Sequence, residues 1–306
     1  MNTPSNTLPE SHAGSQTALV AAMARTRPFY WSVRREIWEN RSIYIVPLVC
    51  AVVGLGTYVF NTILLRQRMH GVWPDLARLH DMLGSPYSDI AFLIMGSAFL
   101  VGIFYSLDAL YGERRDRSIL FWKSMPVSDL TTVLAKVTIP LLVLPLLSFV
   151  ITVITQVLML LLSSLILLGS GLNLATVWSH SSLFHDSFLL FYHILTVHGL
   201  WYAPIYGWFF FVSASAPRAP FIWAFLPPFL ILAIERIAFQ TGYFAQIVMR
   251  RLTGPETPAS AGNMMDAMAY MTPLRFFSEP GLWIGLAIAA VFLVGAVRLR
   301  RYRSPI

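Results

Sequence analysis

The sequence predicts an all-α integral membrane protein with six transmembrane helices, and three observations support this fold class. Of the 306 residues, 56% are hydrophobic and only 12% are charged, whereas soluble domains carry about 25% charged residues. The mean hydropathy of the chain is +0.63. The apolar residues gather in six runs, each long enough for a helix across a hydrocarbon core about 30 Å thick. The predicted spans cover about 43–65, 90–107, 137–168, 188–212, 219–239 and 282–297.

Two segments precede the first predicted span. Residues 1–27 are rich in Ser, Thr, Asn, Pro and Ala and lack the basic start and apolar core of a signal peptide, so they predict a disordered cytoplasmic tail. Residues 28–40 combine aromatic and charged residues at helical spacing, which predicts an interfacial helix that lies flat on the membrane. Phe29, Val33 and Ile37 share one face of this helix, and Arg34, Arg35, Glu36 and Glu39 are expected mostly elsewhere. Its expected surface residues are Trp31, Arg34, Arg35 and Trp38.

Basic residues set the predicted orientation. They gather before the first span, between the second and third spans, and after the last span, where Arg298 and the following arginines are expected to end the span. The positive-inside rule therefore places both termini in the cytoplasm. The expected location is a bacterial inner membrane. The same rule accounts for the net charge of +7 without a nucleic-acid partner. The longest predicted outer segment is 241–280, in which two short helices are expected.

The third span is expected to kink at Pro140 and Pro145. Before it, Pro126 is expected to end a short cytoplasmic helix near Met125. Ser128 or Asp129 is then expected to cap the helix that becomes the third span.

That short cytoplasmic helix is amphipathic. Ile119, Trp122 and Met125 recur at a spacing of three, and Phe121 lies one turn before Met125. The polar side is formed by Arg114, Arg115, Arg117 and Lys123, and Asp108 and Glu113 are expected to pair with Arg114 or Arg115. The pattern predicts a lateral helix with an exposed aromatic tip, and the alternative is a juxtamembrane helix that binds only anionic lipid head groups.

These features together resemble the ABC-2 type permease family, the membrane subunits of ABC exporters. The most specific part of the resemblance runs from Asp116 to Ser128 (DRSILFWKSMPVS) and is followed by Lys136. The resemblance covers Phe29 to the C-terminus and implies an ABC-2 type transmembrane domain at 28–303. The same resemblance implies that the loop is a coupling helix, which docks into a separate ATPase. It also implies that the flat N-terminal helix touches the ATPase, and that two permease copies pair with two ATPase subunits. Asp129 departs from the family pattern, because many relatives carry a basic residue there.

The implied function is that of a permease subunit that couples a separate ATPase to export. The chain has no Gly-x-x-x-x-Gly-Lys-Ser/Thr loop, so ATP and Mg are expected on the ATPase and no cofactor on this chain. No Gly-x-Ser-x-Gly elbow or intramembrane Asp pair indicates an enzyme. Trp122→Ala or a charge reversal at Arg117 is expected to uncouple transport. Two alternatives stay open: a non-transporting membrane anchor, sensor or immunity-type protein that recruits a cytoplasmic partner, and a copper-related permease.

The copper alternative depends on a Met-rich outer stripe, whose members are Met264, Met265, Met268 and Met271. Polar residues within or near the spans are candidates for a substrate pathway, namely His193, His198, Glu235 and Arg236. The histidines form two loose pairs, His180 with His185 and His193 with His198. Each pair is five residues apart, so neither pair is expected to share a face of an α-helix, and no metal site is predicted.

Overall fold

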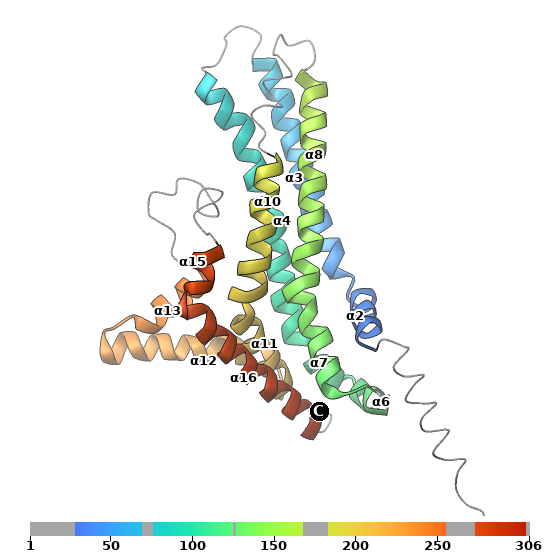
Figure 1. Cartoon of the computed structure of the whole chain (residues 1–306), viewed down its shortest axis with the longest axis vertical. Coiled ribbons are helices and arrows are strands. Elements are labelled where there is room, and N and C mark those ends of the chain that lie inside the picture. The colour runs from blue at the N-terminus through green and yellow to red at the C-terminus, as the bar shows by residue number, and fades with distance from the viewer. Residues whose placement is uncertain (1–27, 69–75, 125–126, 168–182, 255–272, 304–306) are drawn as a thin grey trace, which may run out of the picture.

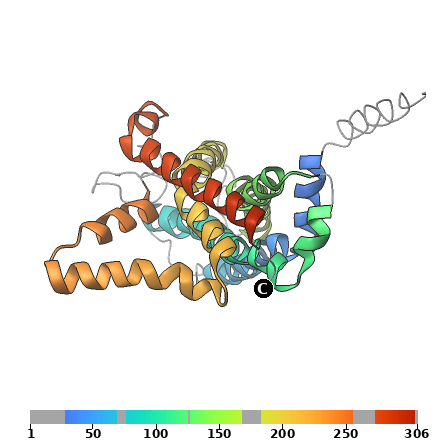
Figure 2. The same cartoon turned by 90° about the horizontal axis from the view of Figure 1, so that it is seen from below.

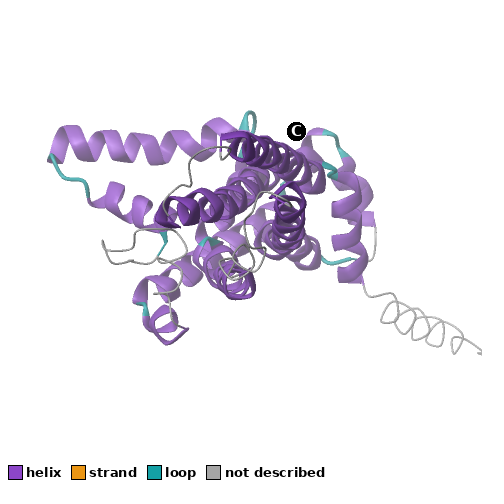
Figure 3. Ribbon diagram, turned by 90° about the horizontal axis from the view of Figure 1, so that it is seen from above, coloured by secondary structure: helices purple, strands orange, loops and turns teal. Residues whose placement is uncertain are grey.

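The computed structural model describes residues 28–68, 76–124, 127–167, 183–254 and 273–303. Within these ranges every regular element is helical and no strand occurs, as Figure 3 shows from above. The prediction of an all-α protein is therefore confirmed for this part of the chain. Several predicted features lie outside the described residues, namely the tail 1–27, Met125, Pro126, His180 and the four methionines Met264, Met265, Met268 and Met271.

Five helices in the described residues are long and apolar enough to cross a membrane. A sixth span results if the pair 187–201 and 203–215, bent by 46° between its halves, is counted as one. The chain is thus a multi-pass membrane protein. The five helices are Ser42–Leu64, Pro86–Arg115, Asp129–Ile166, Pro220–Phe239 and Pro280–Tyr302.

Three long helices form the tall part of the molecule and run side by side in Figure 1: α3 (Ser42–Arg68), α4 (Leu76–Asp108) and α8 (Leu144–Leu167). Ile94 of α4 and Met159 of α8 are fully buried between them. Most of the outward-facing side chains are large and apolar. This pattern is typical of helices that meet lipid rather than water.

In the part of the chain that the structure describes, three short π-helical segments interrupt the helices: η1 (Ile139–Val143), η2 (Ile194–Trp201) and η3 (Glu235–Phe239). The first joins α7 (Asp129–Thr138) to α8 and contains Pro140, which has no amide hydrogen to donate to the preceding turn. The disturbance expected at Pro140 thus takes the form of a π segment, whereas Pro145 lies in the first turn of α8. The second segment lies between α10 (Leu183–His193) and the bend before α11 (Ala203–Ser215).

The last helix, α16 (Pro280–Tyr302), packs against α11. A Cβ on Gly207 of α11 would lie 3.3 Å from Cα and O of Ala289, so small residues allow the two backbones to approach closely. The helix continues through Arg298 to Tyr302, so most of the arginines that are expected to end the span lie in its last turns. In Figure 1, α12 (Pro220–Ile234) runs at a steep angle to the tall bundle.

The predicted short helices are present. α2 (Pro28–Glu39) and α6 (Ser118–Ser124) lie next to each other at one end of the molecule, which is seen from below in Figure 2. This end is called the α6 end here. Two short helices, α13 (Tyr243–Thr253) and α15 (Pro273–Ser278), precede α16, as expected for the segment 241–280.

Candidate functional site at the α6 end

A left-handed residue sets the direction of α6. The preceding helix, α5 (Tyr111–Arg115), ends at Asp116, and Arg117 then has a φ of 56°. Such a backbone conformation is uncommon for a residue with a Cβ and cannot continue a right-handed helix, so α6 begins as a separate helix. On the far side, the Ser128 hydroxyl accepts a hydrogen bond from the amide of Thr131 at 3.1 Å and caps α7. Of the two predicted caps, Ser128 is the one used.

The two faces of α6 differ sharply in exposure. Ile119 is buried, with 1% of its surface exposed, whereas Leu120 and Phe121 are each 59% exposed. The indole of Trp122 lies under the guanidinium of Arg35 in α2, whose Cζ is 3.6 Å from the ring centroid. The predicted helix and its exposed aromatic tip are thus present, but Ile119 belongs to the face that packs against the protein.

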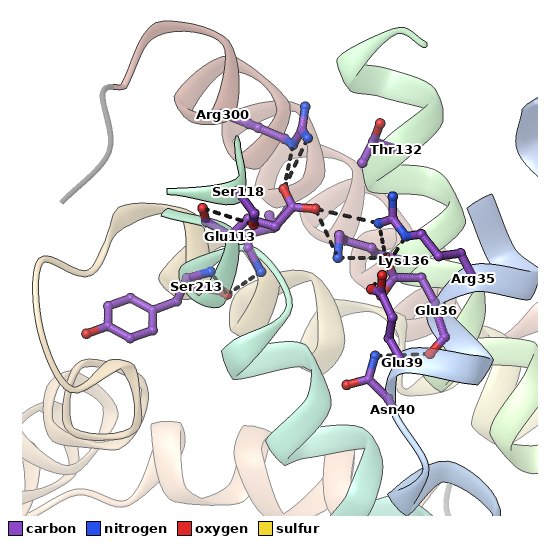
Figure 4. Close-up of polar contacts among 12 residues, drawn as sticks. Arg35, Glu36, Glu39, Asn40, Glu113, Ser118, Thr132, Lys136, Ser213 and Arg300 are labelled. Atoms are coloured by element: carbon purple, nitrogen blue, oxygen red, sulfur yellow. Dashed lines mark hydrogen bonds and ion pairs between the residues drawn. The ribbon is translucent and has the colours of Figure 1, made fainter. Parts of the chain in front are cut away.

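A cluster of charged side chains lies beside α6, and we call it the ion cluster. Figure 4 shows the Glu113 carboxylate between Arg300 on one side and Lys136 and Arg35 on the other. Glu113 Oε1 is 3.3 Å from Lys136 Nζ, and Glu113 Oε2 is 3.1 Å from Arg300 Nη2. Lys136 also binds Glu36, at 2.8 Å from Nζ to Oε1. The full membership is Arg35, Glu36, Glu113, Asp129, Lys136 and Arg300.

The ion cluster balances three cations against three carboxylates. Glu36, Glu113, Lys136 and Arg300 are all buried, and a buried charge is tolerated only when it is paired and hydrogen-bonded. Asp129 meets this need for Arg300, with which it forms an ion pair. An acidic residue at this position therefore has a structural reason.

Glu36 is the most completely bound carboxylate of the ion cluster. Its Oε1 accepts from Lys136 and from Arg35 Nη2 at 2.7 Å, and its Oε2 accepts from the Tyr105 hydroxyl at 2.8 Å. Burial by itself raises the pKa of a carboxyl group, but the charges and hydrogen bonds of Lys136, Arg35 and Tyr105 together hold the pKa of Glu36 below its ordinary value of 4.5. The helix α2 is thereby fixed to α4 and α7.

Arg114 has a different place from the predicted one. It is buried, and its Nη1 donates to the carbonyl oxygens of Ala214 at 2.8 Å and Ala216 at 3.2 Å. These acceptors lie at the C-terminus of α11, where carbonyl groups lack partners within the helix. Arg303 Nη1 donates to the carbonyl of Ser215, the residue between Ala214 and Ala216. The expectation that Arg114 lies on an exposed polar side is therefore wrong, whereas Arg115 and Arg117 are exposed.

The predicted pairing of the acidic residues is half right. Asp108 lies 3.6 Å from Arg115 Nη1, as expected. Glu113 instead pairs with Lys136, Arg300 and, at 3.9 Å, Arg35. Lys123 forms a further link, because its Nζ donates to the carbonyl of Arg301 in α16 at 3.1 Å. The short helix α6 is thus joined to both α2 and α16.

Sequence reasoning did not identify Glu36, Lys136 and Arg300 as parts of one cluster. Only Glu36 could have been recognised as buried from its local sequence. It lies three residues after Val33 and one before Ile37, both of which pack against the core. A charged residue on an apolar helix face needs a buried partner. The partner lies about 100 residues away in sequence, so local spacing does not reveal it.

No protein-family model matches this chain. No curated protein matches it either. The case for a function therefore depends on the resemblance of the sequence and on the geometry of the site.

On α2, Arg34 lies over two indole rings. Its Cζ is 5.1 Å from the ring centroid of Trp31 and 4.5 Å from that of Trp38, and both tryptophans are more than half exposed. Such pairs of aromatic rings and a cation are suited to a membrane interface. Val33 and Ile37 share one face, as expected, and this face packs against the core. Glu36 is buried beside them, so its predicted place off the apolar face is wrong.

The four candidate pathway residues do not meet in one place. Glu235 accepts hydrogen bonds from the amides of Tyr243 at 2.6 Å and Phe244 at 2.9 Å, so it caps the N-terminus of α13. Arg236 is exposed. His193 and His198 do come together, with ring centroids 6.1 Å apart.

The argument from α-helical spacing is wrong for His193 and His198, because η2 is a π-helix, in which hydrogen bonds join residues five apart. His198 is buried, and neither of its ring nitrogens has a hydrogen-bond partner among the described residues. Within the same part of the chain, no group of three or more His, Cys, Asp or Glu side chains is placed to hold a metal ion. His185 and Asp186 lie in α10, and His180 and the Met-rich stripe lie outside the described residues.

Proposed function

We propose that this chain is the permease subunit of an ATP-driven ABC exporter of the ABC-2 type. In this proposal α6 is the coupling helix, and α2 forms the adjoining part of the surface that meets the ATPase. Two copies of the chain pair with two ATPase subunits, which carry ATP and Mg. The assembly lies in a bacterial inner membrane with both termini in the cytoplasm.

The observation that carries the proposal is the connection between the exposed tip of α6 and the ion cluster. Leu120 and Phe121 are exposed, and the neighbouring Trp122 contacts Arg35, a member of the cluster. Through Glu113, Lys136 and Arg300 the cluster reaches the helices α5, α7 and α16. A helix that served only to bind lipid head groups would not need a buried link to three other helices.

The buried ion pairs can transmit a displacement of α6 to the helices that carry their partners. Separating one partner of a buried ion pair costs about 3–5 kcal/mol. When α6 or α2 is displaced, the helices that carry its partners therefore move with it, because joint movement keeps the ion pairs intact. ATP binding to the partner subunits then favours one arrangement of the spans over another, which is the thermodynamic requirement for a nucleotide-driven switch.

The orientation is tested first. Cys50 is the single cysteine of the chain, so a Cys50→Ser background accepts one new cysteine at Phe121 or at Tyr243, both of which are exposed. In right-side-out vesicles a membrane-impermeant maleimide is expected to label Tyr243→Cys and not Phe121→Cys, and in inverted vesicles the order reverses. Labelling of Phe121→Cys from outside would contradict the proposal.

The partner is tested by photo-crosslinking. A photoreactive amino acid at Phe121 is expected to form a crosslink, in native membranes, to a protein that carries a Walker-type ATP-binding loop. The matched control carries the same group at Tyr243 and is expected to give no such product. A crosslinked partner without an ATP-binding motif would favour the anchor or sensor function, and absence of any protein crosslink at Phe121 would reject the coupling role of α6.

A further inference from the structure

The half-buried guanidinium of Arg251 lies outside the ion cluster and has a different set of partners. Arg251 of α13 places its Cζ 4.3 Å from the ring centroid of Trp201, the last residue of η2. Its Nη2 donates to the carbonyl of Gly281, in the first turn of α16, at 2.8 Å. Arg251 therefore joins three elements that the bend in the fourth span brings together.

Gly285 makes room for this guanidinium. A Cβ at Gly285 would collide with Arg251 Nη2 and would lie 2.7 Å from Arg251 Cζ, which is closer than real Cβ contacts come. The guanidinium is thus enclosed between the backbone of α16 and the face of an indole ring. Phe276 and Leu282, both buried, complete the apolar surroundings of Trp201.

Two hydrogen-bond donors in this contact have no acceptor. Arg251 Nη1 and Trp201 Nε1 are both buried, and neither has a partner within the described part of the chain. Trp201 itself is 98% buried, with 2% of its surface exposed. Guanidinium and indole nitrogens can only donate, and a buried donor without an acceptor costs about 1–3 kcal/mol. The missing group must therefore be an acceptor.

The charge balance around Arg251 points to an acceptor that is also negative. Glu279, which precedes α16, lies 2.6 Å from Arg250 Nη2, and no carboxylate among the described residues forms an ion pair with Arg251. Burial lowers the pKa of Arg251, and the adjacent Arg250 lowers it further. An anion beside Arg251 would offset both effects.

We propose that Arg251 and Trp201 form a binding site for an oxyanion, a phosphate or carboxylate group, which accepts hydrogen bonds from Arg251 Nη1 and Trp201 Nε1. The two donors lie beside α13 and α15, on the side of the molecule that the sequence predicts to face outward. The oxyanion belongs either to the head group of an amphiphile or to a small free anion. The site does not depend on the ATPase or on the role of α6.

The test measures the thermal stability of the purified full chain in detergent. Phosphatidylglycerol, phosphatidylcholine and inorganic phosphate are added separately, because a ligand that binds the folded state raises the melting temperature with its concentration. Arg251→Gln removes the charge, and Trp201→Phe keeps an aromatic face but removes the N–H. Arg250→Gln is the matched control, since it changes the adjacent arginine, which pairs with Glu279.

We expect one of the three probes to stabilise the wild type and Arg250→Gln. Its affinity for Arg251→Gln should fall about tenfold or more, and Trp201→Phe should show a smaller loss, as expected for a charged and a neutral hydrogen bond respectively. Stabilisation by a phospholipid identifies a head group as the source, and stabilisation by inorganic phosphate alone identifies a free anion. The proposal is overturned if no probe stabilises the wild type, or if both Arg251→Gln and Trp201→Phe bind the active probe as the wild type does.

Discussion

In the ion cluster every carboxylate lies within salt-bridge distance of a cation, whereas the guanidinium of Arg251 lies against an indole ring and a single backbone carbonyl. Both places hold cationic groups that are buried at least in part. In the first, every charge is paired with an opposite charge of the chain, and these pairs hold helices in fixed relation to one another. The second leaves donors without acceptors, which is the condition expected of a site that receives a ligand. The comparison distinguishes charges that are paired within the chain, and so hold helices together, from a charge that is available to bind a ligand.

The largest expected effect comes from Glu113, the carboxylate that contacts Lys136 and Arg300 at once. Glu113→Gln leaves two buried cations without a full counter-charge, and it should destabilise the protein by about 3–5 kcal/mol. The measurement is the thermal unfolding of the detergent-solubilised chain. Asp116→Asn is the control, because Asp116 is an exposed neighbour and its loss should leave the melting temperature nearly unchanged. Equal melting of Glu113→Gln and the wild type would show that the cluster is not structural.

The next largest effect on stability is expected for Glu36, and this effect depends on pH. Because the pKa of Glu36 in the folded protein lies below 4.5, its stabilising ionised form is fully present above that value and is lost as the pH falls through the lowered pKa. Glu36→Gln should therefore cost about 1.5–3 kcal/mol at neutral pH, and the difference from the wild type should shrink in acid.

The readout for Glu36 is the melting temperature of both proteins over a pH series that ends below 4.5. Glu39→Gln is the matched control. Glu39 is exposed and lies 3.5 Å from Arg35 Nε, so its removal should have an effect of no more than about 1 kcal/mol. A gap between Glu36→Gln and the wild type that stays constant through the acid range would argue against an ionised Glu36 in the folded state.

Substitution of Gly285 tests the contact around the Arg251 guanidinium. Gly285→Ala should displace the Arg251 guanidinium and destabilise the protein by about 1–3 kcal/mol. Combining it with Arg251→Ala should recover part of the loss, because the side chain that collides is then absent. Gly56→Ala is the control, since a Cβ there meets nothing within 4 Å. A double variant no more stable than Gly285→Ala would mean that the collision is not the cause.

The smallest expected effect on stability comes from the contact that links α6 to the cluster. Trp122→Ala removes the indole beneath Arg35 and should cost about 1 kcal/mol. Phe121→Ala, on the exposed side of α6, should lie within about 0.5 kcal/mol of the wild type. Under the proposed function Trp122→Ala keeps the ATPase bound but lowers substrate-dependent ATP hydrolysis in proteoliposomes, and Phe121→Ala weakens ATPase binding itself. If Trp122→Ala kept the wild-type rate of substrate-dependent ATP hydrolysis, the proposed link between the exposed tip of α6 and the ion cluster would be wrong.

Much of the helical order follows from the sequence. The hydrophobic runs locate α3, α8 and α16, and the aromatic and basic residues of 28–40 predict α2. The short helix α6 and the Ser128 cap also follow, because helix ends depend on a few neighbouring residues. These are local features, in which one or two helical turns contain all the interacting groups.

The charge pairing and the π-helical turn of η2 were decided by the tertiary structure. Glu113 has basic residues next to it in sequence, yet it pairs with Lys136 and Arg300, because folding brings the ends of α5, α7 and α16 to one point. The pairing of His193 with His198 likewise needs the π-helical turn of η2, which no spacing rule for an α-helix contains. The sequence by itself determined which segments are helices in a membrane. Only the packing of those helices decided which buried charges are paired and which donors remain without an acceptor, since electrostatic contacts depend on distance in space and not on separation along the chain.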